Sequence, residues 1–168
     1  IAPDPLVDSS YMRRRLAVVD AASGNVVTPI YHKGKLGMST MSPSGQRVAF
    51  IAARDKHDPQ PGRLTVASAT DGTTKELLPD FAGHFVSCAF ASDDVLVYLA
   101  DRGCETVVGR IAVDGSDHQE LLAEPGFVVS AFALARDGRK IALVAQTAAH
   151  PPELFTWEIS SAADTKKR

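Results

Sequence analysis

The chain has 168 residues, of which 45% are hydrophobic and 23% charged, and its formal net charge is −2. This length and balance predict a globular domain with a real core and exclude a disordered chain. The charge argues against a nucleic-acid-binding protein, and no apolar run approaches the ~20 residues of a membrane helix. Two basic clusters, at residues 13–15 and 166–168, are short enough to be ordinary solvated surface.

In chain order, the apolar segments between turn residues predict short strands and no helices. The first two strands precede two sets of four, and three more strands end the chain. The expected strands are residues 15–20 and 26–30, then 36–41, 48–53, 63–69 and 74–78, then 85–90, 95–100, 106–113 and 118–122, and finally 127–132, 141–145 and 153–159.

A turn followed by an apolar strand occurs three times. Met-Ser-Pro-Ser-Gly at 41–45, Phe-Ala-Ser-Asp-Asp at 90–94 and Leu-Ala-Arg-Asp-Gly at 134–138 each lead into such a strand, at spacings of 49 and 44 residues. Repeats of about 40–50 residues without a helical pattern are typical of β-propellers built from four-stranded blades. We therefore predict an all-β fold, a partial β-propeller of four-stranded antiparallel blades with about three blade equivalents.

The repeat also predicts the domain organisation. Residues 1–168 form a single propeller segment, and because three blades do not usually close a ring, we expect it to be a piece of something larger. Its parts are a half blade at 11–30, full blades at 34–78 and 84–122, and a last, incomplete blade at 127–168.

The second strand of each full blade is continuously apolar. An antiparallel strand with one wet face alternates apolar and polar residues, but residues 48–52 and 95–99 do not. Both faces of these strands must be covered, and without helices the cover must be another sheet on each side. Small residues such as Ala49 and Ala142 suit the close approach of neighbouring sheets.

Few residues suggest chemistry. Cys88 and Cys104 are expected to be free thiols, with Cys88 a small core residue, which fits a reducing compartment. Aspartates in the predicted turns are explained by turn chemistry, in which the carboxylate bonds its own backbone. Five scattered histidines show no metal-ligand spacing and are expected to be loop residues. They are His32, His57, His84, His118 and His150.

Nucleophile and phosphate motifs are also missing. Gly-Met-Ser-Thr-Met at 37–41 lacks the second glycine of a nucleophile elbow, so Ser39 is interpreted as an ordinary strand residue. Gly-Thr-Thr-Lys at 72–75 has the wrong spacing for a phosphate loop and lies at a predicted hairpin. We assign no catalytic, cofactor-binding or metal-binding residue, and no cofactor.

The stretch Met-Ser-Pro-Ser-Gly-Gln-Arg-Val-Ala-Phe at 41–50 resembles the blade signature of the propeller in prolyl-oligopeptidase-family serine peptidases, such as acylaminoacyl and dipeptidyl peptidases. His-Pro-Pro-Glu-Leu-Phe-Thr-Trp at 150–157 is similar to the strand that closes the last blade of these enzymes. The resemblance covers about residues 11–168. Related signatures also occur in the propeller of the periplasmic Tol system.

The resemblance implies a non-catalytic propeller segment that gates oligopeptide access to an α/β-hydrolase domain absent from this chain. Whether the parent is an enzyme depends on that domain. The alternative is a non-enzymatic, Tol-like scaffold that binds other proteins through its loops. The implied partners are the hydrolase domain and oligopeptides, with no nucleic acid and no membrane. Exposed end strands favour self-association. The expected compartment is the cytoplasm, with the periplasm as the alternative.

Overall fold

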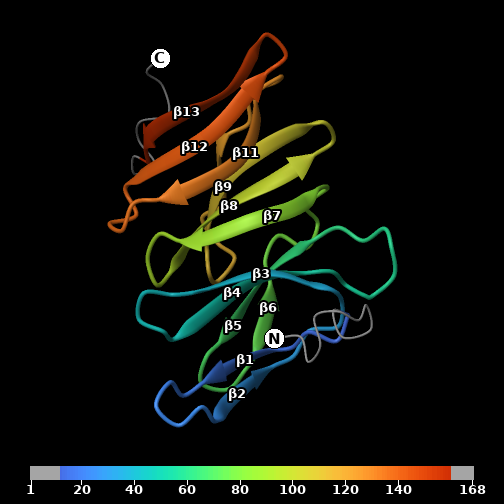
Figure 1. Ribbon diagram of the computed structural model, residues 1–168, viewed down its shortest axis with the longest axis vertical. Coiled ribbons are helices and arrows are strands. Elements are labelled where there is room, and N and C mark those ends of the chain that lie inside the picture. Colours follow the sequence, from blue (N-terminus) through green and yellow to red (C-terminus); the bar gives the residue numbers. More distant parts are fainter. Residues whose placement is uncertain (1–11, 160–168) are drawn as a thin grey trace. The chain divides into compact units, whose positions relative to one another are not determined.

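The computed structural model describes residues 12–159, and residues 1–11 and 160–168 lie outside the described part. Within residues 12–159 there are thirteen β-strands and no helix, so no helix of this part could span a bilayer. The strands form four antiparallel sheets of two to four strands (Figure 1). The chain divides into two compact units, Ile1–Phe81 and Ala82–Arg168, which are treated separately below. That the chain forms a single propeller segment with the blade limits given in the sequence analysis stays a prediction.

The first unit contains a two-stranded and a four-stranded sheet. Each strand pairs with the next one along the chain, as expected for blades formed from successive hairpins. The two-stranded sheet consists of β1 (Leu16–Val19) and β2 (Val26–Ile30). The four-stranded sheet has the order β3 (Leu36–Met41), β4 (Arg47–Ala52), β5 (Arg63–Ser68) and β6 (Thr74–Glu76).

These two sheets of the first unit pack face to face. Val48, Phe50 and Ala52 alternate along β4 and share one core cluster with Ile30 of β2, against which Leu16 also packs. The other side chains of β4 are buried too, since the whole run from Val48 to Ala52 is at most 7% exposed. The continuous apolar run thus predicts the burial of β4 correctly.

A polar link joins the same two sheets. The buried hydroxyl of Thr28 in β2 donates to the carbonyl of Thr70, 3.2 Å away. Beside it, a Cβ on Gly72 would lie 2.4 Å from the carbonyl oxygen of Pro29, and Gly72 has a φ of +74°. The turn between β5 and β6 therefore needs glycine both for its backbone conformation and for its approach to β2.

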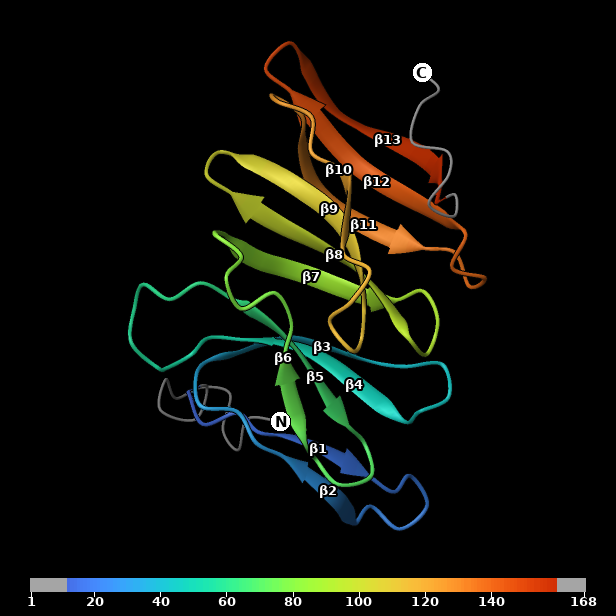
Figure 2. The same cartoon turned by 180° about the vertical axis from the view of Figure 1, so that it is seen from behind.

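The second unit contains a four-stranded and a three-stranded sheet (Figure 2). Both are again built from sequential antiparallel hairpins. The four-stranded sheet consists of β7 (His84–Phe90), β8 (Val95–Arg102), β9 (Glu105–Ala112) and β10 (Gln119–Leu122). The three-stranded sheet consists of β11 (Val128–Leu134), β12 (Lys140–Thr147) and β13 (His150–Glu158).

The core of this second unit lies between its two sheets. Val97 and Leu99 of β8 share a buried cluster with Ile141, Leu143 and Ala145 of β12. The buried hydroxyl of Thr106 in β9 links the sheets as Thr28 does in the first unit. It accepts a hydrogen bond from the Val129 amide at 2.8 Å and donates to the Phe127 carbonyl at 3.3 Å.

On the opposite face of β8, Tyr98 is completely buried. Its ring lies over Gly109, which is directly opposite on β9, and meets the Phe85 ring edge to face at 5.1 Å between centroids. The phenol oxygen reaches Nε2 of His118 at 2.7 Å. A Cβ on Gly109 would stand 2.4 Å from the tyrosine ring, so glycine provides the space that this aromatic side chain fills.

The repeated turns are alike in structure. In the first copy the Ser42 amide donates to the Arg47 carbonyl, and in the third the Ala135 amide donates to the Lys140 carbonyl, in both cases across a left-handed glycine. The middle copy has no glycine and closes one residue earlier, from the Ala91 amide to the Val95 carbonyl. The sequence repeat thus corresponds to a structural repeat.

Most strand limits differ from the prediction by one to three residues, and two of these differences have a local cause. β6 ends at Glu76 rather than at 78, because Leu78 takes a left-handed φ of +50° and a proline follows. β13 begins at His150 rather than at 153, so that both prolines lie inside the strand. Two consecutive prolines are tolerated there because β13 is the outer strand of its sheet and because its pairing with β12 is irregular between Ala145 and Thr147, opposite the prolines.

We expect Gly109→Ala to destabilise the protein by about 1–3 kcal/mol, because the added methyl group overpacks the Tyr98 ring. Urea unfolding followed by circular dichroism would measure the change. In a Tyr98→Leu background the same substitution should cost much less, since the clash is absent. An equal cost in both backgrounds would contradict the proposed contact.

Candidate functional site

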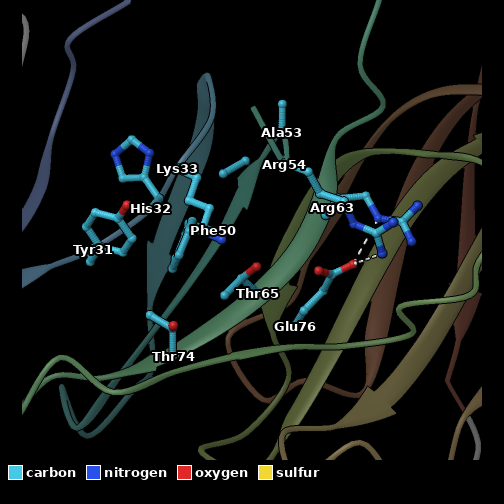
Figure 3. A pocket seen from close by; sticks show the side chains of 11 residues that line it. Tyr31, His32, Lys33, Phe50, Ala53, Arg54, Arg63, Thr65, Thr74 and Glu76 are labelled. Carbon is cyan, nitrogen blue, oxygen red and sulfur yellow. Dashed lines mark hydrogen bonds and ion pairs between the residues drawn. The ribbon is translucent and has the colours of Figure 1, made fainter. Parts of the chain in front are cut away.

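The first unit has a pocket of about 400 Å³ at the end of the β3–β6 sheet (Figure 3). Phe50 of β4 and Thr65 of β5 lie in its middle, between two groups of polar side chains. Residues 31–33, which follow β2, provide one group. Arg54, Arg63 and Glu76 provide the other, from the end of β4, the start of β5 and the end of β6.

Arg63 is a buried cation at this end of the sheet, only 6% exposed. Its Nε donates to Glu76 Oε1 at 3.0 Å, its Nη1 to the Phe81 carbonyl at 3.0 Å, and its Nη2 to the Pro79 carbonyl. A buried guanidinium is tolerated only with such complete pairing. Arg63 thereby fixes both the carboxylate of Glu76 and the backbone that follows β6.

Arg54 shares the same carboxylate from a more exposed position. Its Nη2 donates to Glu76 Oε1 and to the Pro79 carbonyl, at 2.8 and 2.9 Å. The Arg54 side chain is 55% exposed, and no described residue accepts a bond from its Nη1. One carboxylate therefore serves two guanidinium groups, and one of these retains a free donor that faces the solvent.

The pKa of Glu76 is lowered from its ordinary value of 4.5. Burial acts in the opposite direction, but the hydrogen bonds and charges of Arg54 and Arg63 outweigh it. Glu76 is therefore ionised at neutral pH. The pocket carries three permanent cations against one carboxylate, since Lys33 lies in the group across from Glu76.

Residues 31–33 are positioned by a close approach of two loops. Gly34 has no room for a Cβ, which would lie 2.1 Å from the carbonyl oxygen of Ala53. His32 accordingly sits edge on to Phe50, with ring centroids 6.3 Å apart, and its Nδ1 lies 3.0 Å from the Gly34 carbonyl. That carbonyl can only accept, so Nδ1 carries the proton.

Most residues weighed in the sequence as candidates for chemistry lie elsewhere. Ser39 is inside β3 rather than at a strand-to-helix turn, and Gly72 makes the hairpin between β5 and β6. His57 is a loop residue, whereas His84 and His150 begin β7 and β13. Among residues 12–159, no three His, Cys, Asp or Glu side chains gather as a metal site would require. His32 alone lines the pocket described above.

Two other reactive groups are buried. Burial raises the pKa of the Cys88 thiol to about 12, so Cys88 is not a thiolate at neutral pH. The other cysteine, Cys104, is an exposed free thiol. Burial, followed by the charge of Glu120, raises the pKa of Tyr98. The Tyr98–His118 hydrogen bond is thus a structural contact between a buried phenol and an exposed imidazole, and the Tyr98 oxygen is not an activated nucleophile.

Sequence reasoning did not find this pocket. Its polar residues come from four separate segments, and Arg63 and Glu76 appear in the sequence as ordinary strand-end charges. A weak signal was present, since Arg63 starts a predicted strand whose other positions are largely apolar. The antiparallel register then places Arg63 opposite Ala52 and Thr65 opposite Glu76.

Comparison with known proteins shows the fold. No protein-family model matches the sequence, and no curated protein matches it either. Among solved structures, a puromycin-hydrolysing peptidase from Mycobacterium tuberculosis is similar with a TM-score of 0.64 and 15% identity, over 83% of this chain and 22% of the peptidase. TolB from Acinetobacter baumannii gives 0.61 and 19%, over 84% of this chain and 34% of TolB.

A structure from a study of two prolyl endopeptidases is similar with a TM-score of 0.58 and 17% identity, over 74% of this chain and 19% of that protein. The chain thus spans a fifth to a third of these three proteins. With the all-β sheets described above, the likeness confirms the predicted partial β-propeller. Peptidase and non-peptidase propellers both appear, so the fold alone is shared.

We expect Glu76→Gln to destabilise the protein by about 1–2 kcal/mol at pH 7, because a neutral partner leaves the buried Arg63 charge uncompensated. Since the folded-state pKa of Glu76 lies below 4.5, this stabilisation is fully present above that pH and is lost as pH falls through the lowered value. Urea unfolding of both proteins between pH 7 and pH 3 would measure the convergence.

Glu158→Gln is the matched control, since Glu158 pairs with Lys140 at 3.3 Å on the surface. Exposed pairs contribute little, so this variant should unfold within about 0.5 kcal/mol of the unmodified protein at every pH. A Glu76→Gln effect that is no larger than this, or that grows on acidification, would contradict the assigned pairing.

Proposed function

We propose that this chain is a non-catalytic segment of the propeller of a prolyl-oligopeptidase-type serine hydrolase, where it shapes the access of oligopeptides to a catalytic domain outside this sequence. The observation that carries the proposal is the pocket at the end of the β3–β6 sheet. It offers hydrogen-bond donors, a buried aromatic floor and a net positive charge, which are the properties of a recognition site. The likeness to the peptidase propellers and the motif at 41–50 support this assignment.

The proposed role follows from how the pocket is held. Its floor belongs to β4 and β5, whose side chains are mostly buried, so the sheet is a rigid support. Its rim comes from the segments at 31–33 and 53–54, which lie outside the strands. A rigid sheet with polar segments at its end can select a peptide by size and chemistry while the bond-breaking groups lie elsewhere.

A second candidate function is a protein-binding scaffold, as in TolB-like propellers. It is favoured by the TolB likeness and by exposed apolar side chains such as Val26, Val27 and Leu154, which are 62%, 62% and 72% exposed. Under this proposal the pocket would bind a segment of a partner protein. For the compartment we then favour the periplasm over the cytoplasm that was expected first, because TolB is among the similar structures.

The first test is for catalysis. We expect the chain to bind peptides without cleaving peptide or acyl bonds, and to resist labelling by a fluorophosphonate reagent, because its polar pocket has no assigned nucleophile. Mass spectrometry of incubated peptides and of the treated protein would measure both, with an authentic serine peptidase as the positive control. Reagent-sensitive cleavage by this chain would contradict the proposal.

Self-association through open strand edges is a further part of the proposal. In the described structure β1, β2 and β13 each pair on one side only. Unpaired edges promote strand addition, so β13 of one copy can add to β1 of another and make a joined blade of five strands. Two copies, each with about three blade equivalents, would then make a six-bladed ring.

We expect light scattering at micromolar concentration to give about twice the chain mass of 17.9 kDa. Thr156→Pro, which removes an amide in the edge strand β13, should favour the monomer without altering the pocket. A folded chain that stays strictly monomeric at all concentrations would contradict this association.

A further inference from the structure

We propose that the pocket at the end of the β3–β6 sheet binds the free α-carboxylate of a peptide whose C-terminal residues are apolar. The inference rests on the proposed recognition function and specifies its ligand class.

The pocket is rich in donors that have no partner. No described residue pairs with the hydroxyl groups of Tyr31, Thr65 or Thr74, with Nζ of Lys33, or with Nη1 of Arg54. The carboxylate of Glu76 is already shared by two guanidinium groups. The hydroxyl groups can donate or accept, whereas Lys33 Nζ and Arg54 Nη1 can only donate, so the lining favours a ligand that accepts hydrogen bonds, as a carboxylate does.

The charge balance favours an anion. Lys33, Arg54 and Arg63 are positive and Glu76 is the one carboxylate in the lining, which leaves a formal charge of +2 while His32 is neutral. Arg63 cannot move toward a ligand because its three nitrogens are bonded in place. Arg54 and Lys33 are exposed at the rim, and so they are the cations that would contact the ligand.

The rest of the ligand is apolar. The Tyr31 ring, 72% exposed, and the half-buried His32 ring form an aromatic surface beside the donors, and Phe50, at 1% exposure, packs against the His32 ring from the core. A second cavity of about 540 Å³ shares residues 31–33 with the pocket and has an apolar lining that includes Leu16, Ile30 and Val26. Its described lining also contains five basic residues and no acidic one. The two adjoining cavities fit an apolar chain that ends in one negative group.

A terminal carboxylate fits better than an internal acidic side chain or a phosphate. It is joined directly to the last Cα, so the side chain of that residue can lie on the Tyr31 and His32 rings while the carboxylate faces Arg54. A phosphate would carry a second charge without an apolar body to occupy the aromatic surface. The pocket thus matches the C-terminal end of a peptide chain.

The test uses the full chain and the tripeptide acetyl-alanyl-leucyl-phenylalanine as free acid and as C-terminal amide, followed by calorimetry and by amide shift mapping. We expect the free acid to bind at least tenfold more tightly than the amide, with shifts at Thr65 and His32. Arg54→Gln and, independently, Lys33→Ala should each weaken binding of the free acid about tenfold and leave the amide unchanged.

Arg136→Gln is the matched control, because it also removes one exposed positive charge, but in the turn before β12 of the second unit. Circular dichroism would check that all variants fold. Equal affinities for acid and amide, no effect of either pocket variant, or equal weakening by Arg136→Gln would each overturn the proposal.

Two further probes separate the sources of negative charge. An amidated peptide with an internal aspartate should bind like the neutral amide, and inorganic phosphate at millimolar concentration should not displace the free acid. The opposite result with either probe would overturn the assignment to a chain end. These outcomes test the ligand class and not the proposed function. The proposed function fails if the chain cleaves peptide or acyl bonds in a reagent-sensitive way, whatever its preference for a free carboxylate.

Discussion

The structure depends on the two strands β4 and β8, in which the runs at residues 48–52 and 96–100 are buried on both faces and, apart from the Tyr98 hydroxyl, apolar. A single sheet cannot satisfy such a strand in water, because each exposed large apolar side chain costs about 1.5–3 kcal/mol. Each unit solves this for one face by placing a second sheet against it, over Phe50 in the first unit and over Leu99 in the second. Sheet packing is therefore a requirement of these strands.

Close packing of sheets leaves little freedom for polar groups between them. Thr28 and Thr106 are the buried hydroxyls that join neighbouring sheets, and each bonds the backbone of the adjacent sheet or its connecting turn. Polar side chains with more donors are placed at sheet ends, where Arg63 can reach the carbonyl groups of the following loop. The candidate site lies there because strand ends are where unpaired backbone and charged side chains meet.

Local signals in the sequence predicted much of the fold. The continuous apolar runs indicated β4 and β8, and the turn residues indicated the hairpins around Gly45 and Gly138. The pocket could not be predicted, since its parts meet only through strand register and through the loop approach at Gly34. The early end of β6 depends on the backbone conformation of Leu78, for which a leucine gives no sequence signal.

One of the three repeated turns is a residue shorter than the other two, but all three close with the same kind of amide-to-carbonyl bond between strands. The length of the turn can therefore change while the two strands keep their pairing, because the amide-to-carbonyl bond sets the register. The residues inside the turn only connect the two strands. Proteins built this way can differ widely in sequence and still share one fold. This is consistent with a fold that is shared with the similar solved structures at only 15–19% sequence identity.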